Sequence, residues 1–189
     1  IKAIIDERNK SRFTSMQDFI SRLYTDLNKR TLENLIKSGA FDTFGNNRRQ
    51  MMSVYARMLD NEAKQGKDAI SGQMSLFDLV DESEKSQFEI KMPDVSEYTK
   101  EDILAFEKEV LGVYVSGHPL DEYAAMWKKH ISAMSTDFEL DDETGEPKVK
   151  VDSKATIGGM IMAKSVKPTK TGQLMAYLTI EDLVGTVEV

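Results

Sequence analysis

The sequence predicts a mainly α-helical fold with a small β part. In the first third of the chain, apolar residues recur at the three- and four-residue spacing of helices that bury one face. From Ala155 onward the spacing changes to two, which is typical of strands. Between these regions, residues 63–98 are polar and acidic and keep neither period. We therefore expect helices first, a linker, and strands last.

Residues 1–62 are expected to form a helical module. Ser15 and Asn28 are good N-cap residues, because their side-chain oxygens can accept from amides of a first helical turn. Gly39 should end the helix that Asn28 begins, since glycine adopts the left-handed conformation that other residues resist. A further helix should follow Gly45-Asn46-Asn47. The apolar residues expected on inner faces are Ile1, Ile4, Ile5, Met16, Phe19, Ile20, Leu23, Leu32, Leu35, Ile36, Met51, Met52, Val54, Tyr55, Met58 and Leu59.

Order is expected to return after the linker at Thr99, an N-cap that opens a helical connector over residues 99–131. Its first helix should bury a face made of Ile103, Phe106, Val110 and Leu111. Residues 132–153 have the composition of an acidic loop. Residues 154–189 should form three antiparallel strands, the first two joined by a turn at KPTKTG; such a sheet is the opening of a barrel or sandwich.

Composition excludes several classes of protein. The 40% hydrophobic and 30% charged residues are ordinary for a globular chain, and no apolar run approaches the ~20 residues of a membrane span. The absence of cysteine excludes disulfides and thiolate zinc sites and agrees with a cytoplasmic location. The start at Ile1 is neither a signal peptide nor an initiator sequence, which suggests an excised internal fragment.

The net charge of −7 is distributed unevenly. Residues 1–57 hold 11 basic and 6 acidic side chains, whereas the remainder holds 14 and 26, so the net charges are +5 and −12. This asymmetry indicates a basic N-terminal module that can approach phosphates. The alternative is an ordinary solvated helical surface.

No catalytic constellation is predicted. His118 lies near Ser116 and Asp121, but proximity in sequence does not make a triad, and a turn histidine is the expected interpretation. The acidic DFELDDETGEP lacks the ligand alternation of a calcium loop, so we expect no metal site.

The segment around Gly39 is more informative. A helix that turns through Gly39 can aim the amides of residues 39–41 outward, while Phe41 closes the turn from inside. Lys29, Arg30 and Lys37 would add positive charge for a phosphate. The alternative is a glycine C-cap followed by a buried phenylalanine, with no ligand.

The stretch GQMSLFDL places an apolar group inside the polar linker. Its neighbours offer no periodic apolar face that would bury Leu76 and Phe77. The group is therefore either folded back onto a domain as a loop anchor or kept for a partner.

Three blocks of the sequence resemble the alpha subunit family of bacterial replicative DNA polymerase III, the family C polymerases. NKRTLENLIKSGAFDTFGNNR resembles the second hairpin of that family's tandem helix-hairpin-helix region. FEKEVLGVYVSGHPLDEY resembles its connector, and GQLMAYLTIEDLVGTVEV the early strands of its OB fold. The resemblance implies a helix-hairpin-helix module over 1–62 with its first hairpin incomplete, and a partial OB fold over 154–189 that lacks its later strands.

The resemblance also implies two binding sites. Duplex DNA would be held through its phosphates by Lys29, Arg30, Lys37, Ser38, Gly39, Ala40 and Arg48, although Ser38 stands where many such hairpins carry an apolar residue. The family's internal sliding-clamp peptide is similar to Gln-x-x-Leu-Phe, which the sequence matches with Gln73, Met74, Ser75, Leu76 and Phe77. Leu76 and Phe77 would enter a hydrophobic pocket on the clamp, and Gln73 would form amide hydrogen bonds.

The resemblance implies a noncatalytic fragment that acts in chromosomal DNA replication. The catalytic carboxylates and their Mg²⁺ belong to an upstream palm domain of the family, so no cofactor is expected in this fragment. The expected partners are the sliding clamp, duplex DNA, other replisome subunits and, for a complete OB fold, single-stranded DNA; no membrane partner is expected. The alternative is a helical protein-interaction module without a nucleic-acid role, and an enzyme centred on His118 is a third, weaker hypothesis.

Overall fold

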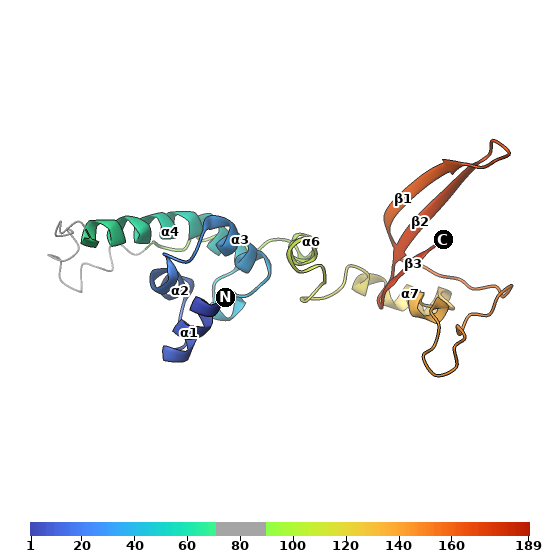
Figure 1. The fold of residues 1–189 in the computed structure, drawn as a ribbon, viewed down its shortest axis with the longest axis horizontal. Coiled ribbons are helices and arrows are strands. Elements are labelled where there is room, and N and C mark those ends of the chain that lie inside the picture. The colour runs from blue at the N-terminus through green and yellow to red at the C-terminus, as the bar shows by residue number, and fades with distance from the viewer. Residues whose placement is uncertain (71–89) are drawn as a thin grey trace. The chain divides into compact units, whose positions relative to one another are not determined.

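The computed structural model describes residues 1–70 and 90–189, and its contacts divide the chain into two compact units. We call Ile1–Ser116 the helical unit and Gly117–Val189 the sheet unit. Most of the helices lie in the first unit and all strands of the described residues lie in the second (Figure 1). The predicted mainly α fold with a small β part is confirmed.

The helical unit is a bundle built on one long helix. Its elements are α1 (Lys2–Lys10), α2 (Met16–Leu23), α3 (Lys29–Lys37), the 3₁₀ helix η1 (Asp42–Phe44), α4 (Arg48–Ile70) and α6 (Lys100–Leu111). Both α2 and α3 pack against α4 (Figure 1). The predicted caps are confirmed, because the side-chain oxygens of Ser15, Asn28 and Thr99 accept from Asp18, Thr31 and Asp102 amides.

Eleven buried apolar side chains form the core of the helical unit. The ring of Phe19 lies between those of Phe13 and Phe41, with centroids 4.9 and 5.0 Å away. Phe41 is 3% exposed, so it closes the α3–α4 turn from inside as predicted. The core residues are Met16, Phe19, Ile20, Leu23, Leu32, Ile36, Phe41, Met51, Val54, Met58 and Leu59.

The structure differs from the predicted linker at both ends. Helix α4 continues to Ile70, eight residues beyond the predicted end at residue 62. In this extension α4 passes close to Tyr24, since a Cβ at Gly66 would lie 2.3 Å from the Tyr24 hydroxyl. At the other end, Ile90 and Met92 pack against the helical core.

Helix α6 covers part of the predicted face, because Ile103, Phe106 and Val110 are half-buried, but its most buried side chains are others. Leu104 and Glu107 are buried, whereas Leu111 is 45% exposed. The helix is rotated toward Glu107 because that carboxylate finds hydrogen-bond donors inside the unit, which an apolar-pattern rule cannot anticipate. The predicted connector over 99–131 is also divided between the two units at Ser116.

The sheet unit combines short helices with an antiparallel sheet of order β1-β2-β3. Its elements are η3 (Asp121–Tyr123), α7 (Ala124–His130), η4 (Ser135–Phe138), β1 (Met160–Pro168), β2 (Leu174–Glu181) and β3 (Thr186–Glu188). The predicted strands and turn are confirmed, but β1 begins at Met160, five residues after Ala155. The predicted acidic loop contains η4.

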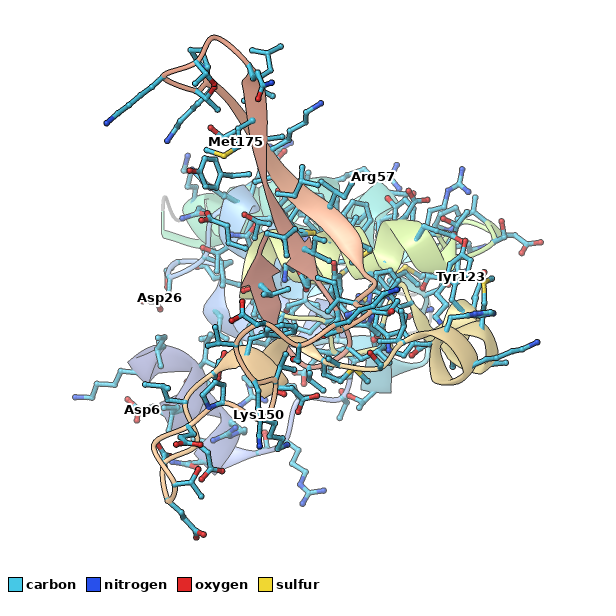
Figure 2. All side chains as sticks on the ribbon, turned by 90° about the vertical axis from the view of Figure 1, so that its right-hand side faces the viewer. Asp6, Asp26, Arg57, Tyr123, Lys150 and Met175 are labelled. Carbon is cyan, nitrogen blue, oxygen red and sulfur yellow. The ribbon has the colours of Figure 1, made fainter. Side chains whose placement is uncertain are left out.

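Few side chains of the sheet are buried. Nearly all of β1 and the first half of β2 are exposed, including Ile161 at 64% and Leu174 at 77%. Figure 2 shows Met175 on this β1–β2 ribbon, near the turn that joins the strands. The buried residues of the sheet unit are Leu120, Trp127, Ala133, Ser135, Glu181 and Asp182.

Candidate nucleic-acid interface

The α3–α4 turn depends on glycine at position 39. Gly39 has φ +78°, and a Cβ there would lie 2.3 Å from Arg48 Nη2. The amides of Gly39 and Ala40 donate to the carbonyls of Ile36 and Leu35, both at 3.0 Å. These bonds close the end of α3, so the two amides do not face outward as the sequence suggested. The prediction was wrong because, in a glycine C-cap, these amides donate to carbonyl groups of the helix that they end.

Arg48 lies inside the helical unit at the start of α4. It is 3% exposed, and its guanidinium donates to Asp42 at 2.8 Å, to the Lys37 carbonyl at 3.0 Å and to Glu107 at 2.9 Å. Hydrogen bonding to Asp42, together with Glu107, raises the pKa of Arg48 against the effect of burial. The arrangement makes Arg48 a structural tie between the turn and α6. Its predicted contact with DNA would require these bonds to break.

Glu107 is the partner that sequence reasoning missed. It is fully buried, and its oxygens accept from Arg48, from the Val115 and Ser116 amides at 2.7 and 2.8 Å, and from the Ser116 hydroxyl at 2.5 Å. Burial raises the pKa of Glu107, but these hydrogen bonds outweigh it and bring the pKa to about 2. The one signal in the sequence is a glutamate three residues after Leu104, on the buried side of α6.

Of the other predicted cations, Lys37 is paired with carboxylates, whereas Lys29 and Arg30 are exposed. Lys37 is paired with Glu33 at 3.0 Å and Glu109 at 3.2 Å, and the Glu33 hydrogen bond raises its pKa. Ser38 donates its hydroxyl to the Leu35 carbonyl and completes the helix end. Lys29 and Arg30 are exposed at the start of α3, with Lys29 2.8 Å from Asp60. These two are the predicted cations that solvent reaches most freely.

The N-terminus of α4 is closed by side chains. Asn47 and Gln50 form a reciprocal capping pair, in which each amide donates to the other side chain at 3.0 and 2.8 Å. The next two amides, of Arg48 and Arg49, donate to the Glu97 carboxylate at 2.8 and 3.1 Å. Sequence reasoning missed Glu97 because it lies in the segment assigned to the linker.

A second basic surface lies on the β1–β2 ribbon of the sheet unit. Residues 153–180 contain four lysines and no acidic residue. Lys167 lies 5.3 Å from the centre of the Tyr177 ring, and the register places Ser165, Lys167, Met175 and Tyr177 on one face. An exposed lysine beside an exposed aromatic ring is a combination of side chains that contacts single-stranded nucleic acids.

The region around His118 is a turn, as predicted. His118 donates its amide to Asp121 at 2.8 Å, and its Nδ1 accepts from the Leu120 amide at 3.1 Å. The Ser116 hydroxyl donates to Glu107. Over residues 1–70 and 90–189, no group of three or more metal-ligating side chains was found, and no helix is long and apolar enough to cross a membrane.

The pentapeptide Gln73–Phe77 lies outside the described residues. Its assignment to a sliding clamp therefore stays a prediction, as does the assignment of individual residues to DNA.

Comparison with known proteins identifies the family. A model described as "Helix-hairpin-helix motif" matches residues 1–51, which include α1, α2, α3 and the turn into α4. DNA polymerase III subunit alpha of Mycobacterium leprae is 34% identical over 191 residues, which cover all of this chain. The chain belongs to the DNA polymerase III alpha subunit family. The alpha subunits of Borreliella burgdorferi and Thermus aquaticus are also 34% identical over the whole chain.

The chain spans a minor part of these alpha subunits. It covers 16% of the Mycobacterium leprae and Borreliella burgdorferi proteins and 14% of the Thermus aquaticus protein. The helix-hairpin-helix match coincides with the basic first third of the chain and with the Gly39 turn.

Proposed function

We propose that the chain acts in DNA replication as a noncatalytic, DNA-binding segment of a DNA polymerase III alpha subunit. The observation that carries this proposal is the full-length similarity to alpha subunits, together with the helix-hairpin-helix match over residues 1–51. By the same resemblance, nucleotide transfer to a primer end, with its Mg²⁺, would belong to a different part of such a subunit. The role of this chain is to hold DNA and replisome partners.

The helical unit binds duplex DNA through phosphates, without sequence preference. Its +5 charge over residues 1–57 and the exposed Lys29 and Arg30 support this. One hairpin reaches few phosphates, so the log-log salt slope should be shallow, about −2 to −4, and the affinity weak, near 10⁻⁴–10⁻⁶ M.

Fluorescence anisotropy with two unrelated duplexes tests this binding. We expect charge reversal at Lys29 and Arg30 to weaken both complexes alike, because phosphates carry no base identity. Charge reversal at Lys64 and Lys67 is the matched control, since both are exposed lysines of α4 that lie outside residues 1–57. No binding even at low salt would remove duplex DNA from the proposal and favour a protein-interaction module.

The pentapeptide Gln73–Phe77 binds a sliding clamp. Two buried apolar side chains contribute roughly 3–6 kcal/mol before ordering costs, which by itself supports only weak binding, with a dissociation constant of about tens of micromolar at best. Replacing Leu76 and Phe77 with Ala should abolish binding to a bacterial clamp in a calorimetric titration. Leu79→Ala is the matched control, because Leu79 lies in the same stretch but outside the pentapeptide. A double variant that still binds with wild-type affinity would contradict the assignment.

Single-stranded DNA is a second candidate ligand, and the β1–β2 ribbon supports it. Lys167 supplies charge beside the exposed Tyr177 ring, and Lys164 and Lys170 lie elsewhere on the same ribbon and its turn. Tyr177→Ala should weaken oligothymidylate binding, whereas Tyr123→Ala, at an exposed tyrosine on η3, should not. Equal behaviour of the two variants would exclude stacking on Tyr177.

A further inference from the structure

Most donors at the α3–α4 turn are already bonded within the helical unit. The two amides that follow α3 donate to carbonyls of that helix. Lys37 and Arg48 are paired with carboxylates. The Arg49 amide donates to Glu97 at 3.1 Å, and the Arg49 guanidinium lies 5.8 Å from the centre of the Tyr98 ring. The turn therefore offers a phosphate few donors that it could use without displacing a partner.

Exposed cations lie together at the start of α3, away from the turn. Lys29 and Arg30 belong to the first turn of α3, and Arg57 lies on α4 three residues before Asp60. The Lys29 ammonium is 2.8 Å from the Asp60 carboxylate, so the start of α3 lies beside this part of α4. Because helix residues three apart are neighbours, Arg57 lies next to the same carboxylate. We call Lys29, Arg30, Arg57 and Asp60 the α3–α4 face.

The charges of the α3–α4 face suit an anionic polymer. Its four side chains are exposed, and its three cations and one carboxylate leave a net charge of +2. Within the part of the chain that the structure describes, no hydrogen bond or ion pair of the Arg30 or Arg57 side chain was found. Lys29 is 53% and Asp60 62% exposed. Water screens an ion pair that is so exposed, so a phosphate can replace Asp60 beside Lys29 at little cost.

We propose that the helical unit holds duplex phosphates on the α3–α4 face, with Arg57 as a further phosphate contact and Asp60 as the counter-ion that a phosphate displaces from Lys29. This inference rests on the proposed binding of duplex DNA and places the contact away from the turn. Lys29 lies eight residues, about 12 Å along α3, from Lys37. DNA then contacts charged side chains of two helices, which recognise phosphates and not bases.

Arg57→Gln in the full chain tests the further contact. Glutamine keeps a polar side chain but loses the charge. We therefore expect the affinity for two unrelated duplexes to fall about fivefold and the salt slope to become shallower by about 0.9, the value of one phosphate contact. Lys67→Gln is the matched control, because Lys67 is an exposed cation of the same helix, ten residues or about 15 Å farther on. It should change the affinity less than about twofold.

Asp60→Asn tests the counter-ion and should act in the opposite direction. Asparagine frees Lys29 and removes a negative charge from the face, so we expect duplex affinity to rise about threefold. Asp94→Asn is the matched control, because Asp94 is exposed and lies beside the turn, where the carbonyls on either side of it accept from Asn47 and Gln50. A rise with Asp94→Asn but not with Asp60→Asn would place the phosphates at the turn and overturn the inference.

Nuclear magnetic resonance of the wild-type chain locates the contact without any substitution. At saturating duplex, we expect the largest amide shifts on the α3–α4 face and smaller shifts at Gly39 and Ala40. Largest shifts at the turn, or equal duplex affinities for wild type, Arg57→Gln and Asp60→Asn, would overturn the α3–α4 face while leaving duplex binding intact. Failure of every form to bind duplex, even at low salt, would overturn the proposed function and this inference with it.

Discussion

The two units stabilise themselves by different means. The helical unit buries eleven apolar side chains in one cluster and adds the Arg48–Glu107 tie at its edge. The sheet unit buries three apolar side chains, and its ordered turns depend on polar groups such as Asp182. Asp182 accepts from the Ser135 amide and hydroxyl and from the Val184 and Gly185 amides, and these bonds lower its pKa despite burial. Apolar packing is thus the main source of order in the helical unit, whereas hydrogen bonds play that part in the sheet unit.

The largest expected effect comes from removing the Arg48–Glu107 ion pair of the helical unit. Glu107→Ala leaves Arg48 buried with one carboxylate partner fewer and frees the Val115 and Ser116 amides. We expect a loss of about 3–5 kcal/mol in the free energy of unfolding, measured by urea titration with circular dichroism. Glu109→Ala, at an exposed carboxylate on the same helix, should cost less than about 1 kcal/mol. Equal losses in the two variants would show that the Arg48–Glu107 ion pair adds nothing to the stability that the apolar core provides.

The second effect separates backbone strain from packing at the α3–α4 turn. Gly39 and Gly45 have φ +78° and +81°, but a Cβ would meet Arg48 at the first and nothing within 4 Å at the second. Gly45→Ala should therefore cost about 1–2 kcal/mol from the left-handed conformation alone. Gly39→Ala should cost about 1–3 kcal/mol more, because Arg48 must move. Equal losses of stability in thermal unfolding of the two variants would mean that Arg48 can move aside without a cost in free energy.

A smaller effect is expected in the sheet unit. Asp182→Asn keeps the shape but replaces a charged acceptor of four hydrogen bonds by a neutral one, which should cost about 1–3 kcal/mol. Hydrogen exchange should show faster exchange of the Val184 and Gly185 amides and no change in α2 or α3. Loss of protection in α2 or α3 as well would contradict a role of Asp182 that is confined to the sheet unit.

The smallest effect, when it is measured per pH unit, is an acid-sensitive part of the helical unit's stability. The pKa of Glu107 falls from 4.5 to about 2 on folding, so its contribution is fully present above pH 4.5. It should be lost as the pH falls from 4.5 toward 2, by at most about 1.4 kcal/mol per pH unit. In Glu107→Gln, urea titrations over this range should show a shallower pH dependence. If unfolding free energy depended on pH as steeply in this variant as in the wild type, other carboxylates would be responsible for acid unfolding.

The contrast between the units also explains what could be predicted from the sequence. Ser15, Asn28 and Thr99 were identified as caps because a cap is decided by residues three positions apart. The strands and their turn were identified by a period of two. By contrast, Glu107 bonds Arg48 across 59 residues, and Glu97 reaches the Arg48 amide across 49. Local periodicity carries no information about such pairs.

The predicted binding site shows the same difference between local features and long-range contacts. Gly39 and Phe41 were placed correctly because a glycine C-cap and an apolar anchor are local features. Lys37 and Arg48 were grouped with Lys29 and Arg30 by charge and by the family resemblance. The fold instead pairs both Lys37 and Arg48 with carboxylates. Charge counts identify a basic region, but only the fold identifies which cations remain exposed.

Trp127 gives the chain a built-in optical label. It is the sole tryptophan of the sequence, it lies in the sheet unit at 8% exposure, and its indole N–H points at the Met134 sulfur 3.4 Å away. Tryptophan emission therefore reports the environment of the sheet unit alone, while helical ellipticity comes mostly from the other unit. The unfolding of each unit can thus be followed in one cuvette, with two wavelengths and without chemical labelling.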